Sequence, residues 1–132
     1  MSGDDARSLM AEARAALKNA HAPYSNFLVG AALRTASGRV YRGANVENAS
    51  LGLSICAERA AIFSAISAGD RDFDAIAVAT RASEPTPPCG ACRQVMLEFA
   101  PDMTIHLAGK SDDIETHTLA ELVPRPFRSF NS

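Results

Sequence analysis

Residues 73–80, Phe-Asp-Ala-Ile-Ala-Val-Ala-Thr, form a near-continuous apolar run that predicts a β-strand buried on both faces. Upstream, the alanine-rich residues 56–68 predict a helix, and Gly69 supplies a typical C-terminal cap. Downstream, after a proline-rich loop, residues 89–99 predict a second helix that stops before Pro101. A buried strand with a helix on either side of it in the chain predicts a layered α/β domain.

The rest of the chain supplies further helices and strands on both sides of this central unit. Residues 5–20 predict an amphipathic helix, because their apolar residues recur at three-to-four spacing. Runs of strand-like residues separated by turn residues predict four more strands, at 28–35, 39–46, 103–107 and 114–118. A short helix is expected at 119–123. The order of elements predicts a three-layer α-β-α sandwich around a mixed five-stranded sheet.

Length and charge limit the class of protein. The 132 residues are expected to form a single domain, 1–132, because a chain of this length buries one core. Thirteen basic residues against 15 acidic ones give a net charge of -2, which argues against a nucleic-acid partner. No apolar run approaches the ~20 residues that a membrane helix needs, so no membrane partner is expected. The acidic N-terminus does not resemble a secretory signal, so the expected location is cytoplasmic.

All three cysteines lie in two short segments, and each segment falls at the start of a predicted helix. The segments are Cys56-Ala57-Glu58-Arg59 and Pro88-Cys89-Gly90-Ala91-Cys92-Arg93-Gln94. A helix N-terminus lowers the pKa of a nearby thiol, because its free N–H groups and its dipole favour the thiolate. Cys89 and Cys92 are three residues apart and share one face of a helical turn. Three thiolates converge on one point if the two helix starts meet above the sheet.

Three soft ligands suit one Zn²⁺ ion per chain, and the lack of a fourth indicates a catalytic site with a position left for water. No histidine in the chain has a spacing that joins it to either cysteine segment. Zinc would lower the pKa of its water from about 15.7 toward about 7. Glu58 is expected to take the proton of this water and pass it to a leaving group. Arg59 and Gln94 are expected to donate hydrogen bonds to the cysteine sulfurs.

Other interpretations of the same residues remain open. A lone Cys-x-x-Cys is also typical of a redox dithiol or of half a structural zinc site. A glutamate near a helix start is commonly a partner of the helix dipole and nothing more. A structural or redox module, however, needs a fourth ligand or a cycling dithiol, and it leaves Glu58 without a role. Cysteine, glutamate two residues later, and then Pro-Cys-x-x-Cys together favour catalysis.

This combination resembles the zinc-dependent cytidine deaminases, specifically the small homotetrameric nucleoside type. The wider group of zinc deaminases carries His-x-Glu followed by Pro-Cys-x-x-Cys. Cys56 stands in the place of that histidine, as in the tetrameric enzymes. The resemblance covers nearly the whole chain. It includes Pro23-Tyr24-Ser25, Phe27 through Ala32, Gly43 through Ala49, and Leu122-Val123-Pro124 with Phe127.

The resemblance implies a cytidine deaminase-like fold and a hydrolase of pyrimidine salvage. Cytidine and 2′-deoxycytidine would become uridine and 2′-deoxyuridine with release of ammonia. Cys56, Cys89 and Cys92 would bind zinc, and Glu58 would carry the proton of the activated water to N3 and then to the departing amino group. The implied substrate contacts are Phe27 against the pyrimidine ring, Asn45 and Glu47 on the ribose 3′-hydroxyl, the N–H of Ala57 on O2, and Phe127 reaching into a neighbouring subunit's pocket.

One residue departs from the pattern of this family. Leu51 stands where a tyrosine is expected near the sugar end of the pocket, so the contacts to the ribose 5′ side and the ranking of substrates are open. An alternative is therefore a deaminase of a cytosine nucleoside analogue such as blasticidin S, since those enzymes share the zinc segments. Phe27, Asn45 and Glu47 favour the ordinary nucleoside. A nucleic-acid base editor is disfavoured by the acidic charge balance.

Overall fold

The computed structural model describes residues 3–130 of the chain. The sheet has five strands in the order β2-β1-β3-β4-β5. In chain order, the elements are α1 (Gly3–Leu17), β1 (Val29–Thr35), β2 (Val40–Ala44), η1 (Leu51–Leu53), α2 (Ala57–Ser67), β3 (Phe73–Thr80), α3 (Gly90–Phe99), β4 (Thr104–Ala108), β5 (Glu115–Thr118) and α4 (Leu119–Leu122).

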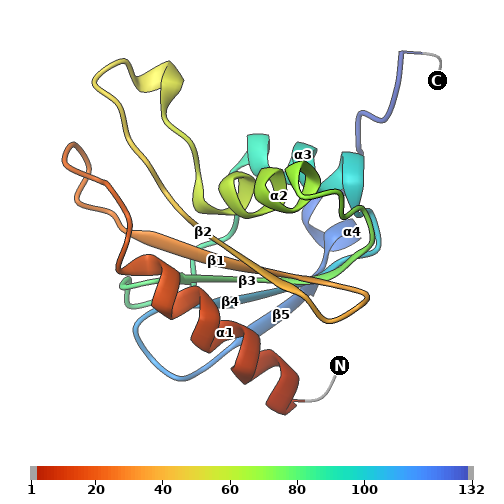
Figure 1. Cartoon of the computed structure of the whole chain (residues 1–132), viewed down its shortest axis with the longest axis horizontal. Coiled ribbons are helices and arrows are strands. Elements are labelled where there is room, and N and C mark those ends of the chain that lie inside the picture. Colours follow the sequence, from red (N-terminus) through yellow and green to blue (C-terminus); the bar gives the residue numbers. More distant parts are fainter. Residues whose placement is uncertain (1–2, 131–132) are drawn as a thin grey trace.

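Helices cover both faces of this sheet. Figure 1 shows α1 on one face and α2 and α3 on the other. β3 lies in the middle, antiparallel to β1 and parallel to β4, so the sheet is mixed. The predicted three-layer α-β-α sandwich around a mixed five-stranded sheet is therefore confirmed.

The apolar run that predicted β3 serves two separate cores. Ile76 and Val78 pack into the core beneath α2 and α3. The alternating alanines of the same strand face the core beneath α1, where Ala32 of β1 joins them. Side chains on a strand alternate between its faces, so a strand buried on both sides must be apolar at nearly every position. The small residues on one face allow α1 to approach the sheet closely.

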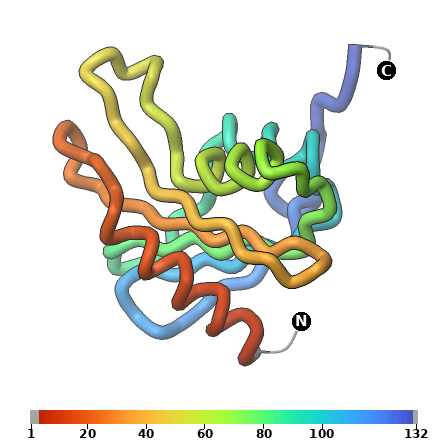
Figure 2. Tube along the Cα trace, in the orientation of Figure 1, coloured from red at the N-terminus to blue at the C-terminus, as the bar shows by residue number. Residues whose placement is uncertain are grey.

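Several element boundaries differ from the sequence prediction, most clearly at the end of β2. The strand ends at Ala44 rather than at residue 46. Beyond it, Val46 forms isolated bridges with His21 and Ile55, which draw the chain away from the sheet. Figure 2 shows the loop after α1 and the loop after β2 projecting side by side at one end of the sheet. This pair of loops forms one wall of the site described below.

None of the helices within residues 3–130 is both long enough and apolar enough to cross a bilayer.

Replacing Gly30 with alanine is expected to destabilise the fold. Gly30 lies in β1 beneath α1, and a methyl group there would lie 2.1 Å from the carbonyl oxygen of Ala13 and 2.5 Å from the backbone nitrogen of Leu17. Because both neighbours are backbone atoms, the whole helix must move, and we expect the free energy of unfolding to fall by about 3 kcal/mol. Urea denaturation measures this loss. Gly52→Ala is the control, since no atom lies within 4 Å of a methyl group there; equal losses in the two variants would contradict the packing argument.

Candidate active site

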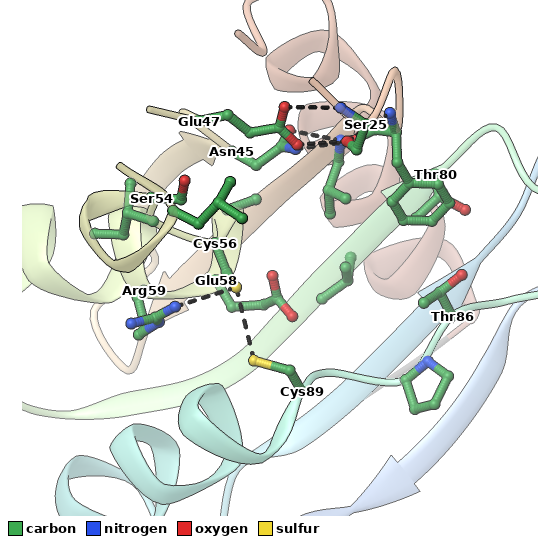
Figure 3. Close-up of a pocket in the computed structure, with 17 residues that line it drawn as sticks. Ser25, Asn45, Glu47, Ser54, Cys56, Glu58, Arg59, Thr80, Thr86 and Cys89 are labelled. Atoms are coloured by element: carbon green, nitrogen blue, oxygen red, sulfur yellow. Dashed lines mark hydrogen bonds between the residues drawn. The ribbon is translucent and has the colours of Figure 1, made fainter. Parts of the chain in front are cut away.

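The starts of α2 and α3 meet, and they bring the three cysteines together. Cys56 and Cys89 are the N-cap residues of α2 and α3, and both have extended backbone conformations. Cys92 lies in the first turn of α3 and is buried. The three Sγ atoms all lie within 4.8 Å of one another, and those of Cys56 and Cys89 are 3.6 Å apart (Figure 3). The segments predicted to converge do converge.

The charges around this cluster favour a bound cation. Hydrogen bonding with Cys92 and with the guanidinium of Arg59, 3.3 Å away, lowers the pKa of Cys56 to about 5. The same contact with Cys56, together with burial, raises the pKa of Cys92. Three thiols at this distance cannot all ionise unless a cation offsets their repulsion. Three sulfur donors around one point fit Zn²⁺, which prefers such soft ligands.

Glu58 lies beside the cluster in a nearly closed environment. It is the second residue of α2, and only 5% of its surface is exposed. Burial raises the pKa of its carboxyl group to about 7. Figure 3 shows its carboxylate in the cavity next to Cys56. A carboxyl group with this pKa can both accept and donate a proton near neutral pH.

A pocket of about 410 Å³ opens next to the cysteine cluster. Its walls come from the loop after α1, the loop after β2, the start of α2 and the loop before α3. Four of the five predicted substrate-binding residues line it: Phe27, Asn45, Glu47 and Ala57. The other lining residues are Ser25, Val29, Leu51, Ser54, Ile55, Cys56, Glu58, Arg59, Val78, Thr80, Thr86, Pro87 and Cys89.

The two polar residues predicted to hold the sugar already have partners within the chain. Asn45 Oδ1 accepts a hydrogen bond from Val29 N, and Asn45 Nδ2 donates one to Phe27 O, both at 2.8 Å. Glu47 Oε1 accepts from the backbone N–H groups of Tyr24 and Ser25, at 3.0 and 3.1 Å. These contacts fix the side chains in the pocket wall. Each side chain keeps some hydrogen-bonding capacity for a ligand.

Besides the buried Cys92, two predicted residues lie outside this pocket, Gln94 and Phe127. The amide nitrogen of Gln94 donates to the carbonyl oxygen of Phe127 at 2.9 Å, so it holds the C-terminal segment and not a cysteine sulfur as predicted. Phe127 packs edge-on against Phe130, with ring centroids 5.5 Å apart, and is largely exposed. The prediction for Gln94 rested on its distance along the sequence from Cys92, which does not determine the direction of its side chain.

Arg93 supports the cysteine loop, a role that was not predicted from the sequence. Its Nε donates to Pro88 O at 2.8 Å, and its Nη1 donates to Leu122 O at 2.7 Å. The guanidinium therefore ties the loop before α3 to the end of α4. Its place inside the Cys-x-x-Cys-Arg-Gln segment was the available signal for such a role.

Comparison with known proteins agrees with this geometry. Residues 4–108 match the family model described as the cytidine and deoxycytidylate deaminase zinc-binding region. The cytidine deaminase of Halalkalibacterium halodurans is 52% identical over 124 residues, which cover 93% of this chain and 94% of that protein. The crystal structure of the cytidine deaminase from Burkholderia pseudomallei superposes with a TM-score of 0.90 at 48% identity, covering 96% of this chain and 100% of that one. A blasticidin-S deaminase from Bacillus cereus is 34% identical over 104 residues, 73% of this chain and 74% of that protein. The chain therefore belongs to the cytidine and deoxycytidylate deaminase family of zinc-dependent hydrolytic deaminases.

Proposed function

We propose that this chain deaminates cytidine and 2′-deoxycytidine, giving uridine and 2′-deoxyuridine with release of ammonia. The observation that carries the proposal is the position of Glu58, buried beside three converging cysteines in a pocket that also contains Phe27, Asn45 and Glu47. A purely structural zinc site or a redox dithiol leaves this buried carboxyl group without a purpose. The identity to the cytidine deaminases, 52% and 48%, exceeds the 34% to the blasticidin-S deaminase and supports the ordinary nucleoside.

We assign the metal to Cys56, Cys89 and Cys92, one zinc ion per chain. Zinc bound by three protein ligands would acidify a water molecule in its fourth position. Arg59 donates to Cys56 Sγ, and its positive charge offsets part of the negative charge that three thiolates bring. The helix N-termini under Cys56 and Cys89 act in the same direction.

Glu58 would accept and donate the proton that the reaction transfers. Its carboxylate would accept a proton from the attacking water, give it to N3 of the pyrimidine, and assist the departure of the 4-amino group as ammonia. A pKa of about 7 suits both directions of transfer at neutral pH. The backbone N–H of Ala57, in the first turn of α2, would hold the pyrimidine O2, because helix N-termini present unpaired donors.

Phe27 would pack against the pyrimidine ring, with Asn45 and Glu47 holding the ribose 3′-hydroxyl. These three residues come from the two loops at the end of the sheet, away from the helix starts that carry the chemistry. The ring face is largely apolar, and an uncharged nucleoside needs few polar groups to fix its orientation.

We further propose that the protein works as a cytoplasmic homotetramer in pyrimidine salvage, with active sites shared between subunits. The exposed apolar side chains support an assembly: Leu51 and Leu53 are both 72% exposed, and Phe127 and Phe130 project from the C-terminal segment. Phe127 lies outside the pocket of its own chain, so it is available to a neighbouring one. Leu51 lines the pocket and is exposed, which supports a place for it in a contact between chains near the pocket.

A substrate panel tests the reaction directly. We expect rapid loss of the cytosine absorbance with cytidine and 2′-deoxycytidine. With cytosine, cytidine monophosphate and blasticidin S we expect at most a slow change, because the proposed contacts hold an uncharged ribose or deoxyribose. Ultraviolet absorbance and product chromatography measure each turnover. Rapid turnover of blasticidin S with little turnover of cytidine would reverse the assignment in favour of the analogue.

The variant Glu58→Gln is expected to keep the metal and lose the reaction. The amide has nearly the same shape, so about one zinc per chain should remain, measured by elemental analysis, while kcat falls by about 10³-fold for lack of proton transfer. Glu98→Gln on the exposed surface of α3 is the matched control and should leave kcat unchanged. Substantial activity in the Glu58 variant would remove that residue from the mechanism.

Shared active sites predict that two defective variants restore each other. Phe127→Ala should lower activity in a neighbouring pocket, and Glu58→Gln inactivates its own pocket, so mixed oligomers regain some pockets with both native residues. Co-expression should give more activity per subunit than the sum of the separate variants. The control replaces the Glu58→Gln partner by the double variant Glu58→Gln/Phe127→Ala, which supplies neither native residue. Equal activity in the two mixtures would show that Phe127 does not act across subunits.

A further inference from the structure

The turn at residues 23–25 is bound to the carboxylate of Glu47 through Tyr24 and Ser25. Glu47 Oε1 accepts hydrogen bonds from the backbone N–H groups of Tyr24 and Ser25, at 3.0 and 3.1 Å. The Ser25 hydroxyl donates to the other carboxylate oxygen, Oε2. Thus Ser25 contacts both oxygens of Glu47, one through its backbone and one through its side chain.

The direction of the Ser25 hydroxyl proton follows from its second partner. The backbone N–H of Phe27 donates to Ser25 Oγ at 3.0 Å and occupies one of its lone pairs. A hydroxyl group has one proton to donate, and Phe27 is fixed as a donor, so the proton of Ser25 points to Glu47. The backbone of Phe27 therefore determines which way the Ser25 hydroxyl acts.

The two oxygens of Glu47 are left in different states. Oε1 already accepts two hydrogen bonds, which is the usual capacity of a carboxylate oxygen. Oε2 accepts one, from Ser25, and keeps one lone pair free. Figure 3 shows Glu47 and Ser25 together on the wall of the pocket, above the cysteine cluster. A single acceptor site with a fixed direction is what recognition of one hydroxyl group requires.

We propose that Ser25 is a positioning residue, whose hydroxyl orients the Glu47 carboxylate so that Oε2 accepts a hydrogen bond from a sugar hydroxyl of the substrate. This inference rests on the proposed nucleoside deaminase function and assigns a residue that determines how the sugar is recognised. Ser25 acts through Glu47 and takes no part in the chemical step at Glu58. Its loss would weaken binding of the hydroxylated sugar and leave the turnover of bound substrate intact.

A merely structural role makes a different prediction. Asn26, the next residue, has a left-handed backbone with φ of 58°, so the same hydrogen bonds could serve only to hold this turn. Loss of the turn would displace Phe27 and weaken every substrate that carries a pyrimidine ring. Loss of Glu47 orientation alone would weaken only substrates with the sugar hydroxyl.

The test compares cytidine with 2′,3′-dideoxycytidine in Ser25→Ala and Ser25→Thr. For Ser25→Ala we expect KM for cytidine to rise about tenfold, the loss typical of a hydrogen bond to a charged group, with kcat within twofold of native. KM for the dideoxy substrate should not change, and Ser25→Thr, which keeps a hydroxyl group, should restore most of the affinity for cytidine. Ser111→Ala, which removes one exposed hydroxyl acceptor of a backbone N–H, is the matched control and should match the native enzyme.

A double-mutant cycle with Glu47→Ala shows whether Ser25 acts through Glu47. Once the carboxylate is gone, Ser25→Ala should cause no further rise in KM for cytidine; an additive loss would overturn the proposal. Equal rises in KM for cytidine and dideoxycytidine would also overturn it and leave a structural role for the turn. If Ser25→Ala does not fold, Ser25→Cys takes its place, because a thiol is a weak hydrogen-bond donor. A rise in KM for cytidine alone then supports the proposal, and equal rises for both substrates overturn it. A native enzyme inactive on every cytosine nucleoside would instead refute the proposed function, and this inference with it.

Discussion

The contact between two helix N-termini is the constraint on which the site depends. Three sulfur atoms lie within 4.8 Å of one another only because α2 and α3 both begin at the same edge of the sheet. The start of α2 reaches this place because β2 offers no side chain at Gly43, where a methyl group would lie 2.4 Å from the carbonyl oxygen of Ala57. A similar close approach between Gly30 of β1 and the backbone of α1 allows α1 to pack on the opposite face of the sheet. The backbone contact at Gly43 thus positions the start of α2, and with it Cys56 and Glu58.

This arrangement places two acidic groups with opposite pKa shifts next to one another. The thiol of Cys56 is stabilised as a thiolate by Cys92 and Arg59, which lower its pKa. Burial raises the pKa of the Glu58 carboxyl group, two residues later, to about 7. The difference follows from position in the helix: Cys56, the N-cap residue, contacts the guanidinium of Arg59, whereas Glu58, the second residue of α2, is buried. One helix start therefore holds both a thiol of the proposed zinc site and the buried carboxyl group proposed to carry the proton.

The sequence predicted the parts that local pattern determines. The apolar run at 73–80 implied a doubly buried strand, and the two cysteine segments implied two helix starts, because both features are short-range. That the two starts meet is a tertiary contact between residues 33 positions apart, which could be stated from the sequence only as a condition. The end of β2 was predicted two residues late, because the bridges of Val46 with His21 and Ile55 are tertiary contacts with no sequence pattern. Gln94 was given the wrong partner for a similar reason: its amide bonds to Phe127, 33 residues away in the chain. The link between Ser25 and Glu47 spans 22 residues and depends on the paired loops, so no spacing rule could reveal it.

The two ends of the pocket are built from different kinds of structure, and this difference bears on how specificity arises. The end beside the cysteines rests on helix starts packed over the sheet, whereas the end proposed to hold the sugar rests on loops joined by side-chain hydrogen bonds such as those of Asn45 and Glu47. Loops tolerate substitution better than helix starts that contact backbone atoms at close range. Leu51, exposed in the second loop and lining the pocket, can therefore vary without disturbing the cysteine cluster. We therefore expect changes in these loops to alter substrate preference while the cysteine cluster and Glu58 stay in place.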